Sequence, residues 1–268
     1  MQRYLGLTHH FLLLTTSWLA SSVLLTSPSQ AATIALSQGS LLFTNFSQSP
    51  TSTFTNADTN ATSIFNGGDV ATKADAIAYL GVTPPVGYSF TSNQVFGENK
   101  DSTGLGSSKA TIQGIFEVDK NFSFNFSGDL NLATLTNNPR QESASVNGNL
   151  GFALINLANN KILDYFQVNG NLTTGKNDSL TYQNSSNVKF SALNNSSLGG
   201  SKEFYTANFD GSLNHYFNNK TTVALVAFNS TEARVSTPTP SMLSGVVLSW
   251  SVIMLGIKRK HIKNNEPC

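Results

Sequence analysis

The chain has 268 residues, of which only 12% are charged, and its formal net charge at pH 7 is +1. Residues 32–236 hold 14 acidic and 11 basic side chains, a net charge of −3, and the 11 cations are scattered singly among Asn, Ser and Thr. Nucleic-acid binding needs clusters of Lys and Arg that displace counterions from phosphates, so this composition argues against a nucleic-acid partner.

The first 31 residues have the pattern of a secretory signal peptide. Arg3 precedes an apolar region from Phe11 to Leu25, and small residues follow at Ser29 and Ala31. A signal peptidase accepts small residues at this spacing, so we expect cleavage between Ala31 and Ala32. The alternative is a retained N-terminal anchor, which the short apolar region, rich in Thr and Ser, disfavours.

Residues 32–235 are expected to form one exported domain. The only cysteine is Cys268, the last residue, so this region can form no disulfide and must be stabilised by ordinary burial. About 200 residues are enough for one hydrophobic core, and all-β sandwiches or barrels often reach this length without splitting.

The domain begins with mixed patterns. Residues 33–42 predict a strand that is broken at Gly39. The polar segment that follows, up to Phe65, predicts loop or edge structure, and residues 100–108 predict a flexible loop.

One short helix is predicted between these segments. Asp69 is a suitable N-cap residue, the interior is rich in alanine, and Gly81 is a suitable stop. Residues 83–87, which include two prolines, predict a rigid turn after the helix.

After Lys109 the hydrophobic period changes to two. Phe122, Phe124 and Phe126 alternate with Asn and Ser, which indicates a strand with one aromatic face and one solvated face. The same alternation returns in residues 149–157, 162–172, 186–193, 203–213 and 221–228, separated by turns rich in Asn, Gly and Ser. The predicted fold class is therefore all-β: an antiparallel sandwich or barrel-like meander with one short helix, flanked by an N-terminal signal helix and a C-terminal transmembrane helix.

The exported region offers few groups for catalysis. His215 is its one histidine, and it lies on an alternating strand with no recognisable triad motif, so we expect an outward-facing residue without a catalytic role. A pair of carboxylates could in principle cleave glycosides. The acids that could supply such a pair are Glu117, Asp119, Asp129, Glu142, Asp164 and Glu203, and no pattern raises one pair above another. We expect neither an enzyme nor a cofactor.

Residues 56–62 carry part of the pattern of a calcium-binding loop. Asn56, Asp58, Asn60 and Thr62 alternate as oxygen-bearing side chains. The segment lacks the central glycine and the terminal glutamate of a full calcium loop, so we expect an Asx-rich turn and no metal.

The C-terminal residues 236–268 have a three-part layout. A Pro238-Thr239-Pro240 spacer precedes an apolar run at 242–257, whose sixteen helical residues would span about 24 Å, less than the roughly 30 Å of a bilayer core. The run ends in a basic stop formed by Lys258, Arg259, Lys260 and Lys263. This indicates a weak transmembrane helix with a cytoplasmic basic tail; the alternative, a buried core helix, does not explain the four cations.

This layout resembles the PEP-CTERM class of bacterial sorting signals, in the PTP variant of cyanobacterial exported proteins. Thr239 stands where the eponymous glutamate would be. The resemblance implies an exosortase-type protease that cuts near Pro240 and releases or transfers the exported domain, so the membrane anchor would be transient; the alternative is a permanent anchor. Residues 32–234 also resemble the uncharacterised β-rich bodies that accompany such tails in cyanobacteria.

The expected function is that of an exported, non-enzymatic cell-surface or extracellular-matrix protein. Its expected partners are signal peptidase, the processing protease, the membrane, and exopolysaccharide or envelope components. One alternative is a secreted carbohydrate-active enzyme. Another is a eukaryotic single-pass type I membrane glycoprotein, because Asn-x-Ser/Thr triplets begin at Asn45, Asn121, Asn171 and Asn219.

Overall fold

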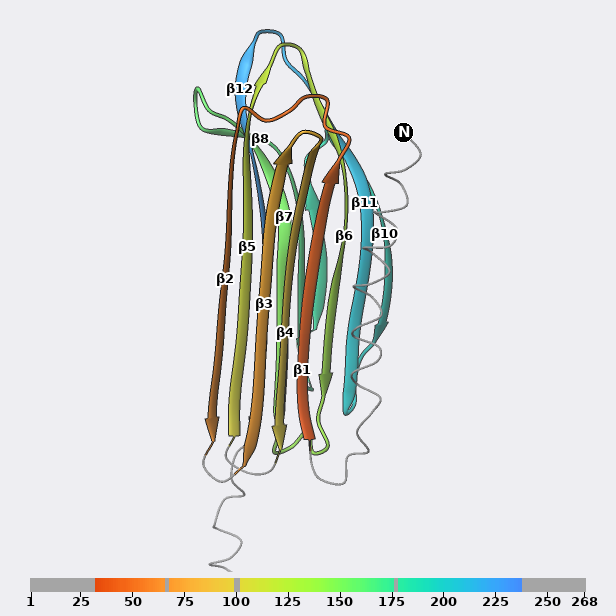
Figure 1. Cartoon of the computed structure of the whole chain (residues 1–268). Helices are drawn as coiled ribbons and strands as arrows, with labels where there is room; N and C mark the ends of the chain where they lie inside the picture. The colour runs from red at the N-terminus through yellow and green to blue at the C-terminus, as the bar shows by residue number, and fades with distance from the viewer. Residues whose placement is uncertain (1–31, 66–67, 99–101, 176–177, 238–268) are drawn as a thin grey trace, which may run out of the picture.

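A computed structural model describes residues 32–65, 68–98, 102–175 and 178–237 (Figure 1). All regular elements in these ranges are β-strands, twelve in number, and all their pairings are antiparallel. The strands form two six-stranded sheets that face each other, so the described region has an all-β, sandwich-like architecture.

The strand order differs from the order along the chain. Sheet A contains, from edge to edge, β10 (Val188–Ser197), β11 (Lys202–Tyr216), β6 (Asn121–Leu135), β1 (Ala32–Thr44), β4 (Pro85–Glu98) and β3 (Asp69–Val82). Sheet B contains β2 (Ser52–Phe65), β5 (Ser102–Val118), β12 (Thr221–Thr237), β7 (Ser143–Asn156), β8 (Lys161–Thr173) and β9 (Ser179–Asn184). The first and last strands, β1 and β12, therefore lie inside their sheets.

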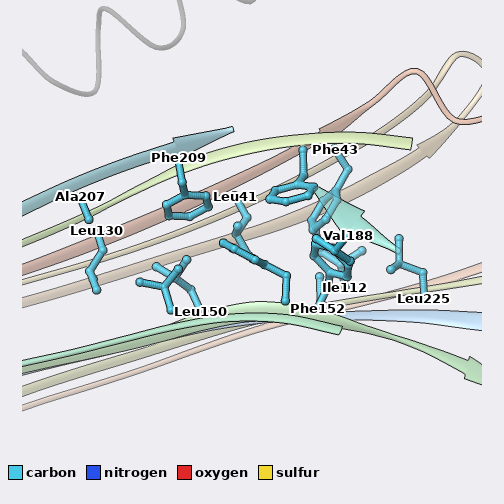
Figure 2. Packing of buried hydrophobic residues seen from close by; sticks show 14 of the residues in the cluster. Leu41, Phe43, Ile112, Leu130, Leu150, Phe152, Val188, Ala207, Phe209 and Leu225 are labelled. Carbon is cyan, nitrogen blue, oxygen red and sulfur yellow. The ribbon is translucent and has the colours of Figure 1, made fainter. Parts of the chain in front are cut away.

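The predicted alternation of strand faces is confirmed in the second half of the chain. Along β6 the side chains of Phe122, Phe124 and Phe126 are buried between the sheets, and the Asn and Ser residues between them are more exposed. Figure 2 shows the core from close by: Leu41 and Phe209 of sheet A point toward Leu150 and Phe152 of sheet B.

One half of this core is aromatic. It lies at the end of the sheets where β5 turns into β6 and where β1 ends. Its rings contact one another in a continuous chain, with centroid distances of 5.1 Å between Phe124 and Phe152 and 4.8 Å between Phe126 and Phe166. We call this set the aromatic half: Phe43, Phe116, Phe122, Phe124, Phe126, Phe152 and Phe166.

A second part of the core, between β1 and β4 of sheet A and β5 and β12 of sheet B, contains a group of buried polar side chains that bond across the two sheets. Asn93 of β4 donates to the carbonyl oxygen of Thr231 on β12 at 2.8 Å and accepts from the hydroxyl of Ser108 on β5 at 2.7 Å. Asn229 of β12 donates to the Gly39 carbonyl at 2.8 Å. We call this set the polar half: Ser37, Thr91, Asn93, Ser108, Asn229 and Thr231.

The sheets approach closely beside the polar half. A Cβ atom added to Gly104 of β5 would lie 2.3 Å from Cγ1 of Val95 on the facing strand β4. A contact that short is sterically forbidden. The absence of a side chain at Gly104 therefore allows β5 to approach β4 closely.

The predicted helix at 69–81 is wrong, because residues 69–82 form the edge strand β3. Alternate positions from Val70 to Leu80 face sheet B, and the alanines among them are small enough for the narrow side of the core. Their helix propensity is overridden by this packing.

Two further boundaries also differ from the prediction. β1 continues through Gly39 without a break, and β5 already begins at Ser102, inside the predicted loop. The polar segment up to Phe65 contains the edge strand β2, which agrees with the edge alternative. The turn predicted at residues 83–87 is confirmed at Thr83 and Pro84 only, because β4 already begins at Pro85.

The predicted terminal segments lie outside the described residues. These are the signal peptide at 1–31, the Pro238-Thr239-Pro240 spacer and all that follows it. Within the described ranges, no helix is long and apolar enough to span a membrane.

Candidate functional site

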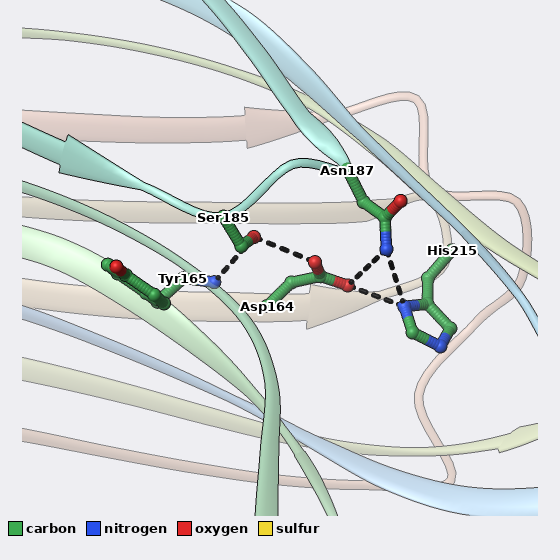
Figure 3. Close-up of polar contacts among 5 residues, drawn as sticks. All are labelled: Asp164, Tyr165, Ser185, Asn187 and His215. Carbon is green, nitrogen blue, oxygen red and sulfur yellow. Dashed lines mark hydrogen bonds and ion pairs between the residues drawn. The ribbon is translucent and has the colours of Figure 1, made fainter.

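A buried carboxylate and the histidine meet at the aromatic end of the two sheets. Asp164 of β8 pairs with Leu154 of β7 next to a register shift in the ladder, and its side chain is only 1% exposed. His215 lies near the end of β11 in the other sheet. Its Nδ1 atom is 2.6 Å from Oδ2 of Asp164, and its side chain is 18% exposed (Figure 3).

Two residues of the turn between β9 and β10 complete the cluster. The hydroxyl of Ser185 donates to Oδ1 of Asp164 at 2.7 Å and accepts from the backbone N–H of Tyr165 at 3.2 Å. The amide of Asn187 donates to Oδ2 of Asp164 at 3.4 Å. One carboxylate therefore ties together β8, β11 and this turn, as Figure 3 shows.

The arrangement of donors fixes what the histidine can do. Because the Asp164 carboxylate only accepts hydrogen bonds, the proton of the neutral imidazole lies on Nδ1 and leaves Nε2 as the acceptor. A triad nucleophile has to be bonded to that free nitrogen. The hydroxyl of Ser185 donates its hydrogen bond to the Asp164 carboxylate instead. The geometry of this cluster is therefore that of a structural link between strands.

Two more acids are buried in other places. Asp129 of β6 accepts hydrogen bonds from the hydroxyl of Ser40 and, at 2.8 Å, from the amide of Asn131. It is 2% exposed although its position faces away from sheet B. Glu203, at the other end of β11 from His215, accepts from the backbone N–H of Gly199 at 3.1 Å.

Burial also changes the acidity of two groups on the outer side of sheet A. It raises the pKa of Asp129 to about 6, against the opposing effect of the hydrogen bonds from Ser40 and Asn131. Burial, and to a smaller extent the Asp129 carboxylate, raises the pKa of Tyr88 to about 12.

The outer side of sheet B carries a different kind of surface. Asn149 pairs with Asn169 across β7 and β8, and Gln167 donates to the side-chain oxygens of both, at 3.0 and 3.1 Å. We call this surface the carboxamide face: Asn147, Asn149, Gln167, Asn169, Asn171 and Gln183. Outward positions 145–153, 165–173 and 179–183 of β7, β8 and β9 hold no charged residue.

The predicted acids do not form one site. Glu117 forms an ion pair with Lys220 at 2.9 Å, and Glu142 accepts from the backbone N–H of Asn137 at 3.0 Å. The buried acids Asp129, Asp164 and Glu203 each have partners of their own. The described residues include no group of three or more His, Cys, Asp or Glu that could hold a metal ion.

Two predictions about single segments are wrong. His215 does not face outward, because its position pairs with Phe122, on the inner side of β6, and its ring contacts Phe217 at 4.4 Å. Residues 56–62 do not form an Asx-rich turn, because they lie within β2, where Asn56 donates to Asp58 at 2.6 Å. Here the ladder to β5 replaces the local side-chain bonds of a turn.

The burial of Asp164 was not predicted, although the alternation of its strand indicates it. It has the same parity as Phe166 and Val168, which are both buried, so an alternating strand places this acid on its apolar face. A buried acid requires partners, and Ser185, Asn187 and His215 supply them.

Comparison of the chain with protein-family models, with curated proteins and with solved structures finds no match in any of the three.

Proposed function

We propose that this chain is an exported, non-enzymatic cell-surface or matrix protein whose carboxamide face binds a neutral exopolysaccharide. The observation that carries this proposal is the uncharged, hydrogen-bonding outer surface of β7, β8 and β9. Each carboxamide offers two donors and one acceptor oxygen, which suits vicinal hydroxyl groups. The absence of charge at the outward positions of this face favours a neutral chain over a polyanion.

The sorting of the protein belongs to the same proposal. Signal peptidase would cleave between Ala31 and Ala32, and an exosortase-type protease would cut near Pro240, as the resemblance of the tail implies. The apolar run at 242–257 would anchor the chain only until that cut, leaving a β-sandwich at the surface or outside the cell. Intact-mass measurement on protein from the native host tests this: a species ending near Pro240 supports it, and one that keeps 242–268 contradicts it.

The separation of the buried acids supports a binding protein over a carbohydrate-active enzyme. Glycoside cleavage uses two carboxylates about 5–9 Å apart on either side of one bond. Asp164 and Glu203 instead serve opposite ends of β11, and each is hydrogen-bonded within the fold.

Binding is tested by co-sedimentation of the full-length chain with an insoluble neutral glucan and with a polyuronate. We expect retention by the neutral glucan. The double substitution Asn149→Asp and Asn169→Asp should lower that retention at least tenfold, because it places two like charges side by side on the carboxamide face.

The matched control is Asn195→Asp, an exposed position of β10 on the outer side of sheet A, opposite the uncharged Thr206. It should leave retention unchanged. If the wild-type chain binds neither polymer, or if the control weakens binding as much as the double substitution does, the carboxamide face is not the binding surface.

A further inference from the structure

The edge strand β2 is exposed along almost its whole length. Thirteen of its fourteen residues are exposed, and Ser63 is half-buried. β2 pairs with β5 through fourteen consecutive positions without a bulge, and its other edge has no ladder partner among the described strands. Sheet A ends at β3, which lies against both β2 and β5 and bonds to β2 through Thr72, yet the inward residues of β2 other than Ser63 stay exposed.

β2 lacks the features that usually prevent edge strands from pairing with other chains. Protein edges are commonly short, bulged, or interrupted by Lys or Pro. From Ser52 to Phe65 there is no Lys, Arg, Pro or Gly, and the one charged residue is Asp58. At the far side of the sheet, by contrast, β9 has only six residues, and Tyr182 donates to Asn194 of the facing strand β10 at 2.5 Å.

The sequence of β2 is self-complementary about Thr59. Positions equally distant from Thr59 carry the same type of side chain, since the order runs FTNAD-T-NATSI. The matched pairs are Asp58 with Asn60, Ala57 with Ala61, Asn56 with Thr62, Thr55 with Ser63, and Phe54 with Ile64. An antiparallel strand centred on Thr59 would bring together acid and amide, alanine and alanine, and apolar and apolar.

The self-complementary pattern has an exposed apolar residue at each end. Phe54 and Ile64 are 59% and 57% exposed, and both lie on the outer side of sheet B. In the antiparallel arrangement each would face the other residue of a second copy, at the distance of a cross-strand pair. Two exposed apolar side chains per copy would become covered.

The hydrogen-bonding direction of the backbone agrees with this register. The carbonyl of Thr62 accepts a bond from the side chain of Thr72 on β3, so it points away from β5. Backbone groups alternate in direction along a strand, so the even-numbered residues of β2 direct their N–H and C=O groups away from β5; of these groups, the Thr62 carbonyl already accepts the bond from Thr72, which leaves its second lone pair for a partner strand. Pairs such as Asp58 with Asn60 would then be hydrogen-bonded pairs, and Thr59 would face Thr59 in a closer, non-hydrogen-bonded pair.

We propose that β2 pairs antiparallel with β2 of a second copy of this chain, across a two-fold axis at Thr59. The contact is isologous, so it closes as a dimer and joins two copies of sheet B into one continuous sheet. A register shifted by one step would set Asp58 against Asp58, and like charges in direct opposition disfavour it. The surface is distinct from the carboxamide face on β7, β8 and β9, so the dimer and the proposed polysaccharide binding can fail independently.

Site-directed cross-linking tests the register. In the full-length chain with Cys268→Ser, Thr59→Cys places two cysteines opposite each other, with a Cα separation of about 4.5 Å that a disulfide can bridge. Mild oxidation should give a covalent dimer on a non-reducing gel. Thr55→Cys is the matched control, because Thr55 faces Ser63 in this register and the two copies of residue 55 would lie roughly 27 Å apart. If Thr59→Cys stays monomeric, or Thr55→Cys cross-links equally well, the register is refuted.

Sedimentation of the unmodified chain in a mild detergent tests the dimer itself. We expect the unmodified chain to be a dimer. Thr59→Asp should raise the dissociation constant of this dimer at least tenfold, since two carboxylates would meet at the two-fold axis. Thr181→Asp is the control: it places the same charge at an exposed position of β9, the opposite edge of the same sheet. A monomeric wild-type chain, or a dimer weakened equally by Thr181→Asp, would overturn the proposal. Circular dichroism confirms that each variant is folded.

Discussion

The two halves of the core hold the same pair of sheets together by different means. In the aromatic half, ring contacts such as Phe43 with Phe152 at 5.7 Å depend on area and shape. In the polar half, Asn93 and Asn229 bond across the sheets to partners at fixed positions. Area burial is non-directional, whereas hydrogen bonds require a defined alignment. We therefore expect the aromatic half to contribute more to stability than the polar half, and the polar half to fix how the sheets are offset.

The largest effect is expected in the aromatic half. Phe152→Ala should lower the free energy of unfolding by about 4 kcal/mol, because it leaves a cavity between rings that contact one another on both sheets. Chemical denaturation measures this. Leu193→Ala, at a position that is 79% exposed, is the control and should change stability by less than about 0.5 kcal/mol. Equal losses in the two variants would contradict the assignment of the core.

A somewhat smaller loss is expected in the polar half. Asn93→Ala should cost about 3 kcal/mol, since it leaves the hydroxyl of Ser108 and the backbone carbonyl of Thr231 without their bonds to Asn93. In the Asn93→Ala background, the further substitution Ser108→Ala should lower the free energy of unfolding by less than it does in the wild-type chain. It removes the hydroxyl that Asn93→Ala has already deprived of its partner. Strictly additive losses in this double-mutant cycle would show that the polar half is not a network.

The polar half and the buried carboxylate of Asp129, on the outer side of sheet A, should differ in how their contributions to stability depend on pH. The pKa of Asp129 in the folded chain, about 6, is raised from 3.8, so the folded state binds this proton more tightly than the unfolded state. The resulting stability is present at low pH and is lost as pH rises from about 4 through 6.

Asp129→Asn should therefore be more stable than the wild-type chain by about 3 kcal/mol at pH 8 and nearly equal to it at pH 4. Thermal unfolding across this range measures the difference. Asn93→Ala should lower stability by a similar amount at both pH values, because the polar half contains no titratable group. Parallel profiles for Asp129→Asn and the wild-type chain would contradict the raised pKa.

The smallest effect concerns the narrow side of the core. Gly104→Ala should cost about 1 kcal/mol, because the added methyl group meets Val95 and the sheets must move apart. Gly175→Ala is not a matched control, since that glycine has a positive φ of 89°. Gly97→Ala is a better one: its Cβ would lie 3.2 Å from Val235, so a smaller loss is expected.

The sequence predicts the strands of the second half well because their alternation is strong. Phe122, Phe124 and Phe126 mark the inner face of β6 without any knowledge of the partners. The sequence of β3 predicts a helix because three of its inward positions are alanines, which have a high helix propensity. In the structure these alanines are favoured for their small size, because β3 packs closely against β5.

The candidate site was harder to predict than the fold. Asp164 and His215 are 51 positions apart, and their contact depends on the strand order of two sheets. Each residue has the parity of buried neighbours, which indicates a buried polar group but not its partner. Likewise, the self-complementary order about Thr59 is visible in the sequence, but only the sheet topology shows that β2 has a free edge.

The place of β12 in the middle of sheet B has a consequence for the folding of the nascent chain. β12 is the last described strand, and it lies between β5 and β7, with Ser102 bonded to Thr237 across 135 positions. At a synthesis rate of about 5–20 residues per second, the roughly 100 residues between β5 and β12 leave the edge of β5 open for about 5–20 s. Until β12 is made, the edges of β5 and β7 that it will join stay unpaired. Sheet B can close only after β12 has been synthesised, so a chain that stops before Thr221 leaves the edges of β5 and β7 unpaired and open to aggregation.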